Sequence, residues 1–205
     1  MLHLRVPSDI SWVTHATEHL DATLVDHAHC ELKAAANALS MAARHSDDPV
    51  VVQTLTGIAR EEIDHFQQVH DRLQARGLAL GTPPTDPYVA ALRRAHATVG
   101  PSPVAGDVAA AVDRLLTCAL IEARSCERFG LLARALESKD RDLASFYSDL
   151  RTSEAHHYRV FVDLAIRTAR AAETSVLDRL GMLAAAEGVI VETLAREGAQ
   201  AAIHG

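Results

Sequence analysis

Two copies of one metal-binding pattern recur along this chain. Each copy has a Glu, followed 31 or 32 residues later by the first residue of a Glu-x-x-His motif. Residues three apart on a helix project from one face, so the Glu and His of each motif can bind one ion together. The six residues are Glu31, Glu62 and His65 in the first copy and Glu122, Glu154 and His157 in the second.

The surroundings of these residues are apolar. Glu62 and His65, for example, share a helix face with Leu55, Ile58 and Val69. A buried carboxylate costs several kcal/mol unless it is paired or bound to metal. The sequence offers no set of core Arg or Lys at matching positions, so we expect two divalent cations to balance the four carboxylates. The alternative is two clusters of hydrogen-bonded Glu and His without metal.

The ligand types also indicate which metal and which chemistry. Mixed Glu and His ligation suits iron or manganese better than a closed structural zinc site. Six protein ligands shared between two ions leave coordination positions open for O2 or water. Iron in such a setting points to oxygen chemistry.

Three neighbours of the ligands are candidates for a supporting role. His27 lies one helical turn before Glu31 and is placed to orient it, although a partly buried His without that role is the simpler interpretation. Cys118 and Cys126 share a helix face with Glu122, either as pocket lining or as small core residues. Four charged neighbours are expected to form ion pairs on helix surfaces: Asp26, Arg124, Glu127 and Arg128.

The elements that position these residues are long helices. Apolar residues at helical spacing predict five of them, at about 8–45 with a possible break near Leu20, 49–76, 106–138, 140–170 and 174–198. Five of the seven prolines lie between Pro83 and Pro103, so residues 77–105 form a crossover, in which the segment from Asp86 can make a short helix. Two helical hairpins joined by one long crossover are typical of the ferritin-like four-helix bundle, here with an additional C-terminal helix. We expect one domain over residues 1–205.

Composition excludes several other classes. The 205 residues are 48% hydrophobic but only 4% aromatic, which fits a core of Ala, Leu and Val in close-packed helices. No run of eighteen apolar residues is present, so a membrane span is excluded, and the first residues lack the apolar stretch of a signal peptide. Three cysteines without a CxxC pair predict a reduced, cytoplasmic protein. The net charge of −7 does not by itself favour a nucleic-acid partner.

Four strings of residues resemble the MiaE family of tRNA hydroxylases, which act on 2-methylthio-N6-isopentenyladenosine beside the anticodon. They are DHAHCELKAA at 26–35, AREEIDH at 59–65, IEARSCERF at 121–129 and SEAHHY at 153–158. The resemblance extends from about residue 20 to 190. The string at 121–129 is the most specific, because a generic ferritin-like bundle needs only its Glu122.

The resemblance implies a ferritin-like fold with a non-haem di-iron site, ligated by the six residues above and with no further catalytic residue. It implies an O2-dependent monooxygenase that hydroxylates the isopentenyl group of the tRNA nucleoside. Two electrons would come from an external donor such as a ferredoxin or a reductase. We expect a monomer or small homo-oligomer with no membrane partner. Candidate contacts to tRNA phosphates are Arg93, Arg94, Arg159, Arg167 and Arg170.

Other functions remain open at this point. A ferritin-like protein that oxidises or handles iron would use the same ligands, and so would a di-iron hydroxylase of another substrate, such as a quinone or lipid. A rubrerythrin-like peroxidase is disfavoured, because no CxxC pair is present for its usual rubredoxin module.

Overall fold

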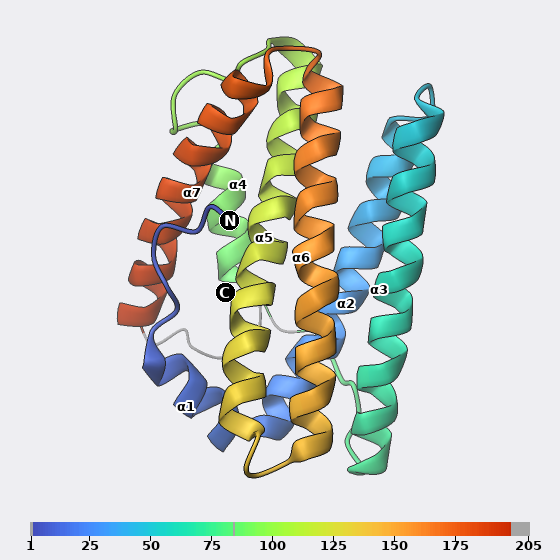
Figure 1. Cartoon of the computed structure of the whole chain (residues 1–205), viewed down its shortest axis with the longest axis vertical. Coiled ribbons are helices and arrows are strands. Elements are labelled where there is room, and N and C mark those ends of the chain that lie inside the picture. Colours follow the sequence, from blue (N-terminus) through green and yellow to red (C-terminus); the bar gives the residue numbers. More distant parts are fainter. Residues whose placement is uncertain (1, 84, 198–205) are drawn as a thin grey trace. The chain divides into compact units, whose positions relative to one another are not determined.

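The structure is a computed structural model that describes residues 2–83 and 85–197. Within this part the chain forms seven helices and no strand (Figure 1). The helices are α1 (Ile10–Glu18), α2 (Leu20–Arg44), α3 (Pro49–Ala75), α4 (Pro87–Ala95), α5 (Gly106–Leu136), α6 (Arg141–Ala169) and α7 (Glu173–Arg196). The five predicted long helices and the short crossover helix are confirmed, and the predicted break near Leu20 falls at His19, between α1 and α2.

Local sequence signals explain where the helices begin and end. The side chains of Asp48, Asp86 and Asp140 accept hydrogen bonds from backbone N–H groups in the first turns of α3, α4 and α6. Such caps satisfy donors that have no partner within the helix. Gly77 follows the last turn of α3 with φ +69°, a backbone conformation that glycine adopts without strain.

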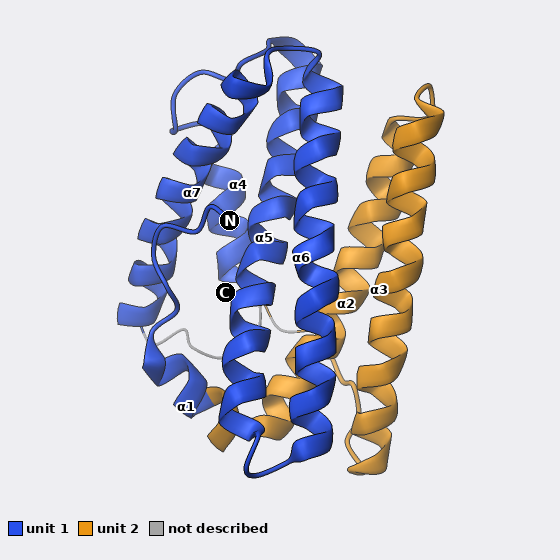
Figure 2. Ribbon diagram, in the orientation of Figure 1, with its two compact units in different colours: residues 1–15, 86–200, 204–205 blue, residues 16–85, 201–203 orange. Residues whose placement is uncertain are grey.

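The chain divides into two compact units (Figure 2). The described part of unit 1 comprises residues 2–15 and 86–197, and that of unit 2 comprises residues 16–83 and 85. Unit 2 holds the hairpin of α2 and α3, which pack along each other. Unit 1 holds the hairpin of α5 and α6, together with α4 and α7. Each hairpin therefore carries one copy of the Glu and Glu-x-x-His pattern.

The cores are built mainly from aliphatic side chains, as the composition predicts. Leu24, Leu55 and Leu73 are fully buried in unit 2, and Leu115, Leu116 and Leu120 are fully buried in unit 1. A smaller cluster in unit 1 packs the crossover helix against the last helix: Tyr88 and Leu92 of α4 with Val191 and Leu194 of α7. No helix of the described residues has the length and apolarity that crossing a membrane requires.

Candidate metal centre

The first half-site lies in unit 2 and combines Glu31 of α2 with Glu62 and His65 of α3. All three side chains are buried, and each offers a ligand atom within 4.8 Å of the others. His65 Nδ1 lies 3.3 Å from a Glu62 oxygen and 3.7 Å from a Glu31 oxygen. The hairpin thus brings together three candidate ligands that are separated by up to 34 residues in sequence.

His27 supports this half-site from one turn earlier on α2. Its Nε2 lies 2.6 Å from Glu31 Oε1, and the imidazole is completely buried. Of the two interpretations of His27, the completely buried contact with Glu31 favours the supporting one over a partly buried His without that role. A neutral His donating from Nε2 would hold one carboxylate oxygen in place and leave the other for a metal ion.

Burial and crowding shift the proton affinities in this half-site. Burial raises the pKa of Glu31 to about 8, and the neighbouring Glu62 carboxylate adds to the shift. Burial alone would lower the pKa of His65, but the Glu31 and Glu62 carboxylates outweigh it and raise the value to about 10. Burial, reinforced by His65, lowers the pKa of His27 to about 3. His27 is therefore neutral at physiological pH, which suits its contact with a ligand.

The second half-site lies in unit 1 and repeats the arrangement. Glu122 of α5 and Glu154 and His157 of α6 are 4%, 2% and 0% exposed. Each offers a ligand atom within 4.8 Å of the other two. The two hairpins therefore present the same set of donors, two carboxylates and one imidazole, in the same compact arrangement.

Cys118 and Cys126 flank Glu122 on α5, and both are buried. The Cys126 thiol donates a hydrogen bond to the backbone carbonyl of Arg151 on α6, at 3.4 Å. Burial raises the pKa of this thiol. A buried thiol that resists deprotonation is chemically inert, which favours the interpretation of Cys126 as a small core residue.

The donor set fits the predicted metal. Carboxylate and imidazole ligands without thiolates are typical of iron and manganese sites. Three ligand atoms that converge in a buried place can hold an ion and leave further coordination positions open. Each half-site taken alone meets this requirement.

The predicted ion pair between Arg124 and Glu127 is present, at 2.5 Å, but the predicted surface location is wrong for three of the four charged residues next to the candidate ligands. Asp26, Arg124 and Arg128 are all buried, and only Glu127 is partly exposed. Arg124 is completely buried and pairs with Glu187 of α7 at 2.8 Å. The spacing of these residues along the helix is typical of an exposed face. It does not reveal that other elements of unit 1 cover this side of α5.

A second buried ion pair also escaped the sequence analysis. Arg179 of α7 contacts Asp113 of α5 at 2.7 Å, and both are buried. The Arg179 guanidinium also donates to the carbonyl oxygens of His96, Val99 and Gly100, which anchors the end of the crossover. Core arginines are therefore present, although these two pair with carboxylates outside the half-sites.

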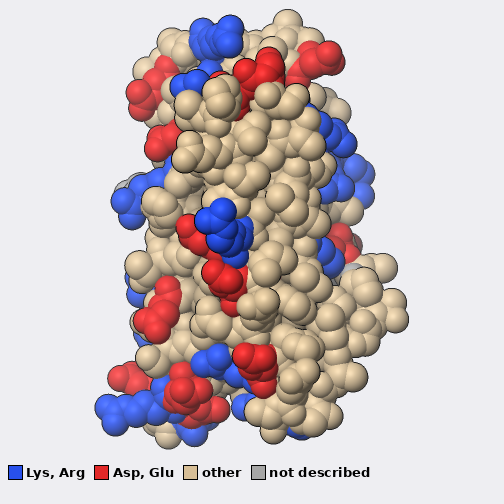
Figure 3. All heavy atoms as spheres, turned by 90° about the vertical axis from the view of Figure 1, so that its right-hand side faces the viewer, with Lys and Arg blue, Asp and Glu red and all other residues tan. Residues whose placement is uncertain are grey.

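The five arginines predicted to contact tRNA are all exposed and all lie in unit 1. Arg93 and Arg94 are in the last turn of α4, Arg159 and Arg167 are on α6, and Arg170 follows α6. Asp163 lies four residues from both Arg159 and Arg167, so α6 does not carry an uninterrupted basic stripe. Figure 3 shows another face of the molecule, on which basic and acidic side chains are interspersed among uncharged ones. Contact with tRNA stays a prediction for these residues.

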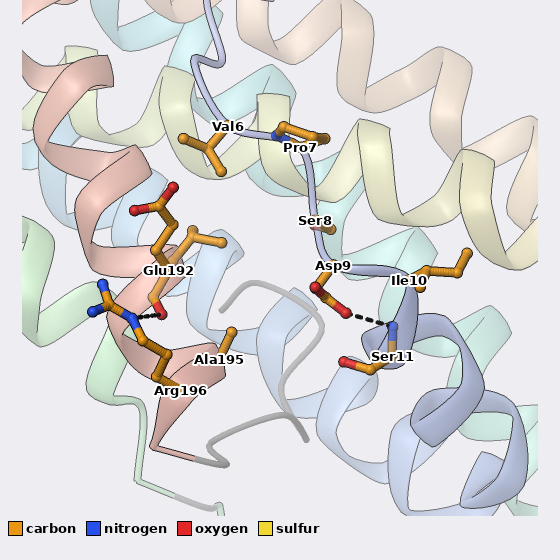
Figure 4. Close-up of a pocket in the computed structure, with 10 residues that line it drawn as sticks. Val6, Pro7, Ser8, Asp9, Ile10, Ser11, Glu192, Ala195 and Arg196 are labelled. Carbon is orange, nitrogen blue, oxygen red and sulfur yellow. Dashed lines mark hydrogen bonds between the residues drawn. The ribbon is translucent and has the colours of Figure 1, made fainter.

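Unit 1 also contains a cavity of about 590 Å³ between the N-terminal segment and α7 (Figure 4). Its wall includes Ser8 and Asp9 from the segment before α1, and Glu192 and Arg196 from α7. None of the six candidate ligands lines it.

Comparison with known proteins gives consistent matches over most of the chain. A family model described as tRNA-(MS[2]IO[6]A)-hydroxylase (MiaE) matches residues 1–202. A tRNA 2-(methylsulfanyl)-N(6)-isopentenyladenosine(37) hydroxylase from Pseudomonas putida is 36% identical over 162 residues, which covers 79% of this chain and 74% of that protein. A protein of the same name from Salmonella typhimurium is 28% identical with the same coverage.

A solved structure is also similar to this chain. It is the structure of protein 43 with aldehyde deformylating oxygenase activity from Synechococcus, which is 37% identical to this chain. The TM-score is 0.86, and the match covers 98% of this chain and 95% of that one. The likeness confirms the predicted all-α, ferritin-like fold class.

Proposed function

The chain belongs to the MiaE family of tRNA hydroxylases, and from this premise we propose that it is an O2-dependent monooxygenase of the isopentenyl group on an adenosine next to the tRNA anticodon. We propose further that two iron ions serve the reaction. The ligands would be Glu31, Glu62 and His65 from one hairpin and Glu122, Glu154 and His157 from the other.

The observation that carries the metal proposal is the duplicated half-site. Two hairpins, one in each unit, both bury two carboxylates and one imidazole with their ligand atoms within 4.8 Å. In each half-site, two buried carboxylates would repel each other and lose hydration without a compensating charge. Two divalent cations supply that charge.

The proposed hydroxylation needs iron, an electron donor and a protein site that holds both the metal ligands and the nucleoside. Iron bound at these residues would supply the activation of O2. One oxygen atom enters a C–H bond of the isopentenyl group, and the other leaves as water, with two electrons and two protons added. The electrons must come from an external donor, for which a ferredoxin or a reductase is suitable. The protein's own contribution is to hold the six ligands in place, exclude water and position the nucleoside.

The tRNA reaction can be tested in cells that lack this protein. The cells are complemented with the wild-type chain or with Glu154→Ala, and the nucleosides of their tRNA are analysed. We expect the hydroxylated isopentenyl nucleoside with the wild-type chain and only its unhydroxylated precursor with the variant. Equal amounts of the hydroxylated nucleoside in cells with and without the wild-type chain would exclude the tRNA assignment.

A second candidate is an oxygenase that acts on an aldehyde. It is favoured by the similar structure, which belongs to a protein with aldehyde deformylating oxygenase activity. Supplying the iron-loaded protein with O2, a reductant and either a fatty aldehyde or hypomodified tRNA separates the two. Conversion of the aldehyde without conversion of the tRNA would favour the second candidate.

Iron handling without an organic substrate is a third possibility. Iron storage requires a closed shell of many subunits. We propose instead a monomer or small homo-oligomer that meets its tRNA in the cytoplasm, and gel filtration would distinguish this from a shell.

A further inference from the structure

The completely buried Arg124 lies at the centre of a polar network inside unit 1. Its guanidinium makes five hydrogen bonds, two of them to the carboxylate of Glu187 on α7, both at 2.9 Å. The other three go to Glu127 at 2.5 Å, the Ser8 hydroxyl at 3.2 Å and the Val6 carbonyl at 2.9 Å. Five bonds engage the full donor capacity of a guanidinium.

Other residues complete the network. The Tyr88 hydroxyl of α4 donates to Glu187 at 2.9 Å. Glu127 accepts from both the backbone N–H and the hydroxyl of Ser8, at 2.9 and 2.7 Å. The network therefore joins α5 to α4, to α7 and to the segment before α1.

Close packing holds the N-terminal segment in this network. A Cβ atom built at Gly188, next to Glu187, would lie 2.8 Å from Cγ2 of Val6. Any side chain at residue 188 would therefore push Val6 away from α7. Because residue 188 is glycine and has no side chain, the Val6 carbonyl lies within hydrogen-bond distance of Arg124.

The position of Arg124 on α5 relates this network to the metal ligand Glu122. Two residues correspond to a turn of about 200°, so the two side chains leave nearly opposite sides of α5. A carboxylate near the outer edge of a helix lies about 5 to 6 Å from its axis, and a rotation of 10° would move it by about 1 Å. Functional ligands must be held to about 0.5 Å. Contacts on the reverse side of α5 can prevent such a rotation.

We propose that Arg124 is a positioning residue. Its contacts on the side of α5 opposite Glu122 fix the rotation of the helix about its axis, and so the position of Glu122 at the metal. Glu187, Glu127 and Ser8 are its partners in this role. The inference rests on the proposed metal centre and adds residues that do not touch the metal themselves.

The test uses Co²⁺ alone as a probe on the full-length chain, because its visible absorption responds to ligand geometry. Arg124→Lys keeps the charge but loses the two-pronged contact with Glu187. The double variant Arg124→Met with Glu187→Leu removes both members of the completely buried pair. Glu127 also loses Arg124, but it is partly exposed and keeps its two hydrogen bonds from Ser8. We expect the double variant to bind Co²⁺ roughly 10- to 100-fold more weakly, with an altered spectrum, and Arg124→Lys to fall in between.

The other buried α5–α7 ion pair is a matched control. Arg179→Met with Asp113→Leu also removes a buried pair between the same two helices, but nine residues before Glu122. We expect it to lower thermal stability and to leave the Co²⁺ spectrum and affinity as in the wild type. If both double variants alter the spectrum equally, or if neither does, Arg124 is a structural residue only and the inference is wrong.

The Co²⁺ titrations also distinguish a failure of the proposed metal centre from a failure of the positioning role. If the wild-type chain binds no Co²⁺, or if Glu122→Ala binds it as well as the wild type does, the metal centre itself is refuted and the inference falls with it. If Glu122→Ala abolishes binding while the Arg124 variants match the wild type, only the positioning role is refuted.

Discussion

The hairpins of units 1 and 2 carry the same set of candidate ligands, but different residues contact them and the helices they lie on. In unit 2 the first Glu, Glu31, has a direct partner in His27, 2.6 Å away. In unit 1 the equivalent position before Glu122 is Cys118, whose thiol is at most a weak donor. Two residues beyond the first Glu, unit 2 has the partly exposed Lys33, whereas unit 1 has the buried Arg124.

This difference follows from what covers each hairpin within its own unit. The reverse side of α5 is enclosed by α4, α7 and the N-terminal segment, so charged residues there must be paired. On α2 the residue equivalent to Glu127 is the exposed Ala36. In unit 2 a hydrogen bond from His27 reaches Glu31 directly, and in unit 1 the Arg124 network contacts the reverse side of the helix that carries Glu122.

The largest expected effect tests whether the two half-sites are equivalent. Loss of any one ligand should lower bound iron and abolish tRNA hydroxylation, because each iron ion would need all of its ligands. The variants replace one residue by Ala: Glu31 or His65 in unit 2, and Glu122 or His157 in unit 1. Iron content and nucleoside analysis on the purified variants measure both. Unchanged iron in the variants of one hairpin would remove that hairpin from the metal centre.

The ion pairs should differ strongly in their contribution to stability. Arg179→Met in unit 1 leaves the buried Asp113 carboxylate without its partner and should cost about 3 to 5 kcal/mol. Arg76→Met in unit 2 removes a solvent-exposed pair with Asp21 and should cost about 0 to 1 kcal/mol. Urea unfolding of the two variants gives the comparison, and equal losses would contradict it.

Metal binding should depend on His27, next to Glu31, but not on Cys118, at the equivalent position before Glu122. His27→Phe removes the hydrogen bond to Glu31 and should weaken metal binding by about 10- to 100-fold. Cys118→Ala, at the equivalent position, should change the metal affinity little. Metal titration followed by Co²⁺ absorption provides the measurement. Equal effects of both substitutions would mean that the two half-sites are supported in the same way.

The smallest effect is expected at the unit 2 counterpart of Arg124. Lys33→Met should change the free energy of unfolding by less than about 0.5 kcal/mol, since this residue is partly exposed. It should also leave the Co²⁺ spectrum unchanged. A spectral change as large as that of the Arg124 variants would show that α2 is held through its reverse side as well.

Much of the architecture follows from local signals. Apolar periodicity predicts the long helices, and Asp caps and Gly77 are local signals at their ends, because these features depend on residues within a few positions. The same local geometry places Glu62 beside His65 and His27 beside Glu31. The recurring spacing then predicts the two half-sites, and each hairpin brings its own three residues together.

The sequence did not predict which residues the charged side chains of α5 contact. Arg124, Glu127 and Arg128 have the spacing of surface ion pairs, and nothing within α5 tells a solvated face from a covered one. Glu187 follows Arg124 by 63 residues, and Val6 precedes it by 118.

The amino-acid sequence by itself thus determined the helices, the ligand types and the faces on which they lie, because these depend on the 3.6-residue repeat and on side-chain chemistry. Only the tertiary structure decided which charged residues are buried and what they pair with. Burial depends on elements that are distant in sequence, and their packing is not encoded in any single helix.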